Sequence, residues 1–214
     1  KITNIKIIKN INNRGPGIAR NKGIRLAKGN KLLFLDCGDK LFIKNLLLLI
    51  KKYKHLSNNV IFNKVRNTTR HNNFHTISEK DNYYLRLKKF FVESIDLEAL
   101  FILYNKNFLI KNKIFFKTGI YEDIYFMFLF YVKNKLVIKK FNKSVYHKIY
   151  SPNAITSTFS KRHLNDFISS LTNIYKYLKK NKNLYTRLNK SFQYRLRGEY
   201  VNLYQKIQKN KFSK

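Results

Sequence analysis

Short apolar runs separated by polar turns open the chain and predict alternating strands and helices. Residues 5–8 form the first apolar run, and residues 18–28 read as a helix, with Gly29 as the expected C-cap. Residues 32–35 are continuously apolar and end at Asp36, a pattern typical of a strand buried on both faces of a parallel sheet. Strand, helix and strand in this order predict a βαβ unit with a right-handed crossover.

The middle of the chain continues this pattern and predicts an α/β fold. Helices are expected where a run of about a dozen residues is strongly apolar, and strands where apolar residues gather in shorter runs. The predicted helices cover residues 42–53, with 46–50 packed inward, and 122–132; the predicted strands cover 60–62, 99–104, 136–138 and 144–147.

The pattern changes at residue 161, where apolar side chains begin to recur about once per helical turn. Two such stretches follow one another, and together they hold 14 Lys and Arg against only two acids, Asp166 and Glu199. This composition predicts two basic amphipathic helices. We therefore divide the chain into a catalytic domain, residues 1–158, and a basic helical extension, residues 159–214.

Composition limits the class of protein. Of the 214 residues 44% are apolar, which is enough for a buried core. Cys37 is the single cysteine, so no intrachain disulfide forms and a reducing cytoplasm is the expected setting. The longest uncharged apolar run, 124–132, is far shorter than the roughly 20 residues that a membrane-spanning helix needs.

The charge is extreme, with 45 basic against 11 acidic residues and a formal net charge of +34. Such an excess indicates anionic partners: nucleic acid, a membrane surface or sugar-nucleotide diphosphates. Part of it follows from residue usage, because Lys occurs beside Asn, Ile, Phe and Tyr, which all have A/T-rich codons. No helix-turn-helix, zinc-finger or RNA-recognition signature is visible, so nucleic acid is not the expected partner.

Two motifs in a fixed order carry the most specific information. Residues 13–23 read N-R-G-P-G-I-A-R-N-K-G and are followed by F-L-D-C-G-D at residues 34–39, and residues 119–126 read G-I-Y-E-D-I-Y-F. This order resembles the family 2 glycosyltransferases, over roughly residues 1–158. The resemblance implies a partial GT-A fold, a Rossmann-like mixed sheet flanked by helices, and transfer of a sugar from a nucleoside diphosphate donor.

Acidic residues after the strand at 32–35 would lie where open α/β sheets bind ligands. Asp36 and Asp39 offer hard oxygen ligands for Mg²⁺ or Mn²⁺, which would bridge the donor phosphates. The family motif is D-x-D, so Gly38 stands where a ligand is expected and puts the metal requirement in question. The alternative is that both acids only shape a turn and cap the next helix.

The resemblance gives Asp123 the role of general base toward the acceptor hydroxyl, in an inverting reaction. Glu122 beside it would orient or cap. A carboxylate in a partly buried cleft suits proton abstraction because burial raises its pKa. The alternative is that both acids only supply negative charge to a helix N-terminus.

Further site residues follow from the resemblance. Arg20 and Asn21, with Gly15, Gly17 and Asp36, are expected at the donor site, and an arginine can hold phosphate or carboxylate bidentately. A salt bridge from Arg20 to a nearby acid is the alternative, and the two glycines equally suit a plain loop.

His147 is a candidate third metal ligand, although a lone histidine on a late strand more commonly has a structural role.

In the family, a strand, a helix and a second strand precede the segment that Lys1 opens, so the chain is expected to lack the part that grips the nucleotide. The expected acceptor is a surface glycan of the capsule or lipopolysaccharide type, or a lipid-linked precursor. The expected location is cytoplasmic, with the basic helices against the inner face of the membrane. A non-catalytic glycosyltransferase-like protein and a nucleic-acid-binding basic protein are the alternatives.

Overall fold

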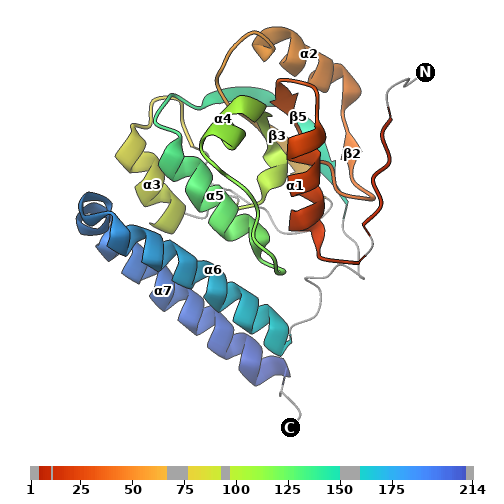
Figure 1. Cartoon of the computed structure of the whole chain (residues 1–214). Helices are drawn as coiled ribbons and strands as arrows, with labels where there is room; N and C mark the ends of the chain where they lie inside the picture. The colour runs from red at the N-terminus through yellow and green to blue at the C-terminus, as the bar shows by residue number, and fades with distance from the viewer. Residues whose placement is uncertain (1–4, 11, 67–76, 93–96, 150–159, 211–214) are drawn as a thin grey trace.

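The computed structural model describes residues 5–10, 12–66, 77–92, 97–149 and 160–210 (Figure 1). A sheet forms the centre of the molecule, and helices cover both of its faces. A long helical hairpin lies against one of these helical layers. Among the described residues, no helix combines the length and the apolar character that a membrane crossing requires.

The sheet has five strands in the order β1-β4-β3-β5-β2. Strands β3 and β5 run parallel, and the other neighbours pair antiparallel. The strand bounds are β1 Lys31–Leu32, β2 Lys40–Leu41, β3 Val60–Arg66, β4 Ile102–Asn105 and β5 Lys139–Lys148.

The helices divide the core into two clusters, one on each face of the sheet. Successive residues of β4 alternate between them, since side chains of a strand point to opposite faces: Ile102 and Tyr104 join the cluster on the α5 side, and Leu103 joins the cluster under α2. The helix bounds are α1 Pro16–Leu26, α2 Ile43–Tyr53, α3 Tyr83–Val92, η1 Ala99–Phe101, α4 Lys106–Lys111, α5 Glu122–Lys133, α6 Lys161–Lys180 and α7 Lys182–Asn210.

The fold class and most helices agree with the sequence prediction, but the opening βαβ unit is wrong. Residues 5–8 form no strand, and the side chains of Ile5 and Ile7 are 72% and 82% exposed. Strand β1 is only two residues long and pairs antiparallel with β4, while Leu35 is 50% exposed. A strand is buried on both faces only where helices cover both faces of its sheet; β1 instead lies at the edge of the described sheet, with β4 as its neighbour.

Three smaller predictions also need correction. Helix α1 ends at Leu26 with Ala27 as its cap, so Gly29 is not the C-cap. In the 46–50 run, Leu47 is 61% exposed, because a helix with 3.6 residues per turn cannot turn consecutive side chains to one face. Residues 136–138 precede β5, which begins at Lys139, and do not form a strand of their own.

The two basic helices of the tail are confirmed, and they belong to the same core as the sheet. Phe167, Ile174 and Leu178 of α6 and Leu188 and Phe192 of α7 are buried in the cluster that contains α3 and α5. The predicted boundary between residues 158 and 159 lies outside the described residues.

Candidate active site

Three carboxylates converge on the guanidinium of Arg20. Its Nη2 donates to Asp36 Oδ1 at 2.8 Å, and its Nη1 donates to Glu122 Oε1 at 2.8 Å and to Asp123 Oδ1 at 3.1 Å. The Arg20 side chain is 11% exposed, whereas that of Asp36 is 40% exposed. Residues from three separate parts of the chain thus meet between α1, the segment after β1 and the start of α5.

Close packing of α1 against α5 brings Arg20 to these acids. A Cβ on Gly17 would lie 2.9 Å from Glu122 Cγ, from Phe116 Cβ and from the Lys117 carbonyl oxygen. Only a glycine allows that approach without displacement. Gly15 precedes the helix at φ +85°, a left-handed conformation that glycine adopts without strain. The structure thus gives Gly17 a packing role, and the contact of both glycines with a donor stays a prediction.

Asn21 is 6% exposed and locks α1 to the segment before α5. Its Nδ2 donates to the Phe116 carbonyl at 2.9 Å, and its Oδ1 accepts from the Phe116 N–H at 2.9 Å. Both the nitrogen and the oxygen of the amide therefore have a backbone partner, and this reciprocal pair holds the register between α1 and the segment before α5. Its predicted contact with the donor stays a prediction.

Burial and the charges of nearby acids raise the pKa values of the two acids at the start of α5. Burial raises the pKa of Glu122 to about 7, and the charge of Asp123 adds to the rise while Arg20 opposes it. Burial also raises the pKa of Asp123 to about 6, opposed by the charge of Arg20 and by the N–H of Ala99, which donates to Asp123 Oδ2 at 3.3 Å. Although burial lowers the pKa of Arg20, the charges of Asp123 and Asp36 hold it above its ordinary value.

These shifts give the two carboxyls different protonation at neutral pH. Asp123 is mostly ionised, with a pKa close enough to 7 to accept a proton from a hydroxyl in a reaction. Glu122 is divided between its two forms, and its Oε2 is buried without a hydrogen-bond partner among the described residues. Near neutral pH Asp123 is thus the member of the pair better suited to accept a proton, and both acids share Arg20 Nη1.

The turn that follows Asp36 is organised by Tyr146 of β5, a residue that the sequence prediction missed. The Tyr146 hydroxyl donates to Asp39 Oδ2 at 2.6 Å and accepts from the Asp36 N–H at 3.1 Å. The N–H of Ile149 donates to Asp39 Oδ1 at 2.8 Å. A single tyrosine on a strand reads as a core residue in the sequence, so no signal marked it.

The donor set fits a divalent ion only at Asp36. Both carboxylate oxygens of Asp39 accept hydrogen bonds from the protein, and Gly38, at φ +89°, supplies no ligand. His147 stacks on the Phe42 ring, with centroids 5.8 Å apart. The described residues contain no cluster of three His, Cys, Asp or Glu placed to hold a metal. Among the described residues the other oxygen of Asp36, Oδ2, has no hydrogen-bond partner, and Mg²⁺ commonly binds one or two carboxylates together with substrate phosphates.

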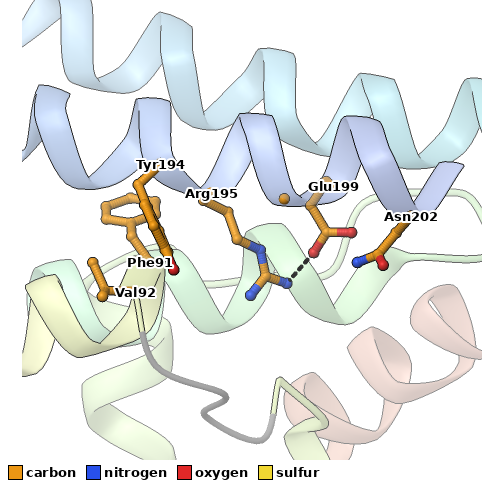
Figure 2. A pocket seen from close by; sticks show the side chains of 7 residues that line it. Phe91, Val92, Tyr194, Arg195, Glu199 and Asn202 are labelled. Carbon is orange, nitrogen blue, oxygen red and sulfur yellow. Dashed lines mark ion pairs between the residues drawn. The ribbon is translucent and has the colours of Figure 1, made fainter. Parts of the chain in front are cut away.

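A separate shallow cavity of about 130 Å³ lies between the end of α3 and α7 (Figure 2). Arg195 and Glu199 form an ion pair of 2.6 Å along its wall. None of the four residues of the Arg20 cluster lines it, so this cavity is distinct from the candidate active site. Its lining is Phe91, Val92, Tyr194, Arg195, Gly198, Glu199 and Asn202.

Comparison with known proteins gives a family and a fold. The sequence model of Glycosyl transferase family 2 matches residues 1–133 of the chain. No curated protein matches the chain. Among solved structures, S. aureus TarS has a TM-score of 0.53 and 20% identity, covering 77% of this chain and 27% of TarS.

Two further TarS structures are similar to the chain. TarS 1–349 has a TM-score of 0.52 at 20% identity, covering 77% of this chain and 45% of that one. Its complex with UDP-GlcNAc has a TM-score of 0.50 at 20% identity, covering 69% and 42%. The chain thus spans less than half the length of these proteins, and the likeness shows a GT-A-like fold.

Proposed function

Because the chain belongs to glycosyltransferase family 2, we propose that it transfers a sugar from a nucleoside diphosphate donor to a hydroxyl acceptor, with Asp123 as the general base. The observation that supports this most directly is the convergence of Asp36, Glu122 and Asp123 on Arg20. Strongly perturbed pKa values cluster at functional sites, and burial raises those of Glu122 and Asp123.

In the proposed reaction, Asp123 takes the proton of the acceptor hydroxyl while that oxygen attacks the anomeric carbon of the donor. The bond from the anomeric carbon to the diphosphate oxygen breaks, and the nucleoside diphosphate leaves with the electron pair. Attack from the face opposite the leaving group inverts the configuration. Arg20 holds Asp123 in place through its Nη1. Glu122 accepts from the same nitrogen and so fixes the orientation of the guanidinium.

The donor diphosphate is proposed to lie beside Asp36, the most exposed acid of the cluster. A Mg²⁺ or Mn²⁺ ion held there by Asp36 and the phosphates would stabilise the charge of the leaving diphosphate. Arg20 already makes three carboxylate contacts, so its proposed part at the donor site is to position Asp36. The TarS 1–349 structure with UDP-GlcNAc makes this nucleotide sugar a suitable donor probe.

The acceptor is proposed to be a surface glycan or its lipid-linked precursor, made at the cytoplasmic face of a membrane. Supporting this, the outward faces of α6 and α7 expose basic residues and tyrosines. Lysine attracts anionic lipid and tyrosine favours the headgroup region. We expect sedimentation with phosphatidylglycerol vesicles that is lost at high salt; no sedimentation at low salt would contradict this contact. The exposed residues include Lys176, Lys179, Lys180, Lys190, Tyr194, Tyr200 and Tyr204.

A non-catalytic glycosyltransferase-like protein is the second candidate. Gly38 supports it, because the position expected to ligate a metal carries no side chain and the space around it is open. Such a protein would bind UDP-GlcNAc without releasing UDP.

The test measures UDP release from UDP-GlcNAc by the purified chain, together with UDP-GlcNAc binding by calorimetry. We expect Asp123→Asn to remove turnover and to keep donor binding, because the amide preserves the shape but cannot accept the proton. The control is Glu79→Gln, which changes a carboxylate at the far β3–β5 side of the sheet. Binding without turnover in the unmodified chain would favour the second candidate, and neither binding nor turnover would contradict both.

A further inference from the structure

Helix α6 holds the segment that leads into Glu122 and Asp123. We propose that Asp166 and Ser170 are positioning residues for Asp123, so that the helical extension is part of the catalytic machinery. This inference rests on the proposed function, because it assumes that Asp123 is the group whose position matters. Both residues lie beyond residues 1–133, which the family model matches.

The first contact is at Gly119 and Ile120. The Ile120 N–H donates to Asp166 Oδ2 at 3.0 Å. Gly119 adopts φ +124°, and a Cβ there would lie 3.1 Å from Asp166 Cγ. The carboxylate thus sits directly against a backbone turn that only glycine adopts without strain, which fixes the direction in which the chain enters α5.

The second contact is at Tyr121, the residue immediately before Glu122. The Ser170 hydroxyl donates to the Tyr121 carbonyl at 3.0 Å. The Tyr121 ring packs edge-on against Phe167, with centroids 5.2 Å apart. Tyr121 is the N-cap of α5 and makes no capping hydrogen bond with its own side chain. Side chains of α6 therefore hold the peptide that starts α5.

The start of α5 sets the position of Asp123 relative to Arg20. Asp123 is the second residue of the helix, so a rotation or shift of the first turn moves its carboxylate away from Arg20 Nη1 and the Ala99 N–H. A displacement of about 1 Å from a distant change can lower a rate by about a hundredfold. The contacts from α6 oppose this displacement, because they hold the backbone just before α5.

The helical extension is suited to this role for two reasons. Helix α6 is fixed to the core, and both acids of the extension lie near the segment that leads into α5. Phe167, Ile174 and Leu178 are buried against the same cluster as α5. The tail has 14 basic residues and only two acids. One, Asp166, binds Ile120; the other, Glu199, lies close enough to Tyr121 to add, after burial, to the rise in the pKa of its phenol.

The experiment compares Asp166→Ala and Ser170→Ala with Asn165→Ala and Ser169→Ala, the adjacent exposed positions of α6. Turnover of UDP-GlcNAc gives kcat and KM, and thermal unfolding reports the fold. We expect kcat to fall about tenfold or more in the first pair, with KM within about twofold. Asp166→Asn should recover much of the rate, because its amide oxygen still accepts from the Ile120 N–H.

A second measurement does not depend on turnover. The chain has only 11 Asp and Glu residues, so ¹³C NMR can follow each carboxyl through a pH titration. We expect the pKa values of Asp123 and Glu122 to move in Asp166→Ala and Ser170→Ala and to stay in both controls. Loss of UDP-GlcNAc turnover in the unmodified chain would count against the proposed function, while the titration still decides the positioning. Unchanged Asp123 titration in folded Ser170→Ala and Asp166→Ala would overturn the inference.

Discussion

Arg20 and Glu122 form an ion pair of 2.8 Å in which both side chains are nearly buried, at 11% and 5% exposure. Removing one member of a buried pair leaves an uncompensated charge, which usually costs more than the pair contributes. The same guanidinium binds Asp36 and Asp123, so its removal would leave three acids without their shared cation. Arg20 is therefore the structural centre of the site.

We expect Arg20→Met to destabilise the chain by about 3 kcal/mol at pH 7.5. The three acids then repel one another without a cation, and the pKa of Asp123 rises further. Urea unfolding followed by circular dichroism measures the change, with Arg14→Met at an exposed position as the control. A change below about 0.5 kcal/mol, equal to that of the control, would contradict the role of Arg20.

The raised pKa of Glu122 predicts a pH-dependent stability. A carboxyl whose pKa is about 7 in the folded chain and ordinary in the unfolded chain binds more protons when folded. Stability is therefore greatest below the unfolded pKa and falls as the pH rises from about 4.5 through 7. We expect the free energy of unfolding to decrease by on the order of 2 kcal/mol across this window.

Glu122→Gln is the control for this dependence, because the amide cannot ionise. Unfolding of this variant should show a clearly smaller change between pH 5 and pH 7.5. A pH dependence identical in the unmodified chain and in Glu122→Gln would exclude Glu122 as its source.

Two glycines of α1 predict opposite effects of the same substitution. A Cβ on Gly17 meets three atoms at 2.9 Å, whereas a Cβ on Gly23 meets nothing within 4 Å. Gly17→Ala should destabilise the chain by about 1–3 kcal/mol through overpacking. Gly23→Ala should stabilise it by about 0.5–1 kcal/mol, because alanine favours the helix. Thermal unfolding of both variants tests the close approach of α1 to Glu122, and equal effects would contradict it.

The hydroxyl of Tyr146 is expected to stabilise the turn after Asp36. Tyr146→Phe removes the hydroxyl that bonds Asp39 and the Asp36 N–H, and should destabilise the chain by about 1–2 kcal/mol. Tyr194→Phe, at a side chain that is 62% exposed, is the control. Urea unfolding gives both values, and a loss no larger than that of the control would show that the hydroxyl does not hold the turn.

The motifs led from the sequence to the residues of the site because each precedes or follows a regular element. Arg20 lies on α1 after the glycine-rich turn, and Asp123 lies in the first turn of α5, so both positions follow from local patterns. The salt bridge from Arg20 to nearby acids was among the sequence alternatives. That Arg20 binds three acids could not be predicted, since the number of its partners depends on how α1 and α5 pack.

Features that depend on packing between distant segments were missed or wrong. Residues 5–8 have the composition of a strand but are exposed, because pairing and not composition decides whether an apolar run joins a sheet. The antiparallel pairing of β1 was also missed. Asp166 and Ser170 read as polar positions of an amphipathic helix, and only the placement of α6 shows which backbone groups they bind.

The most direct test is the pH dependence of UDP-GlcNAc turnover in the unmodified chain and in Asp123→Asn. A base with a pKa of about 6 must be ionised to act, so the rate should rise with pH through about 6 and then level off. Asp123→Asn should remove this rise together with the activity. Turnover in Asp123→Asn at the unmodified rate, with the same profile, would contradict the account.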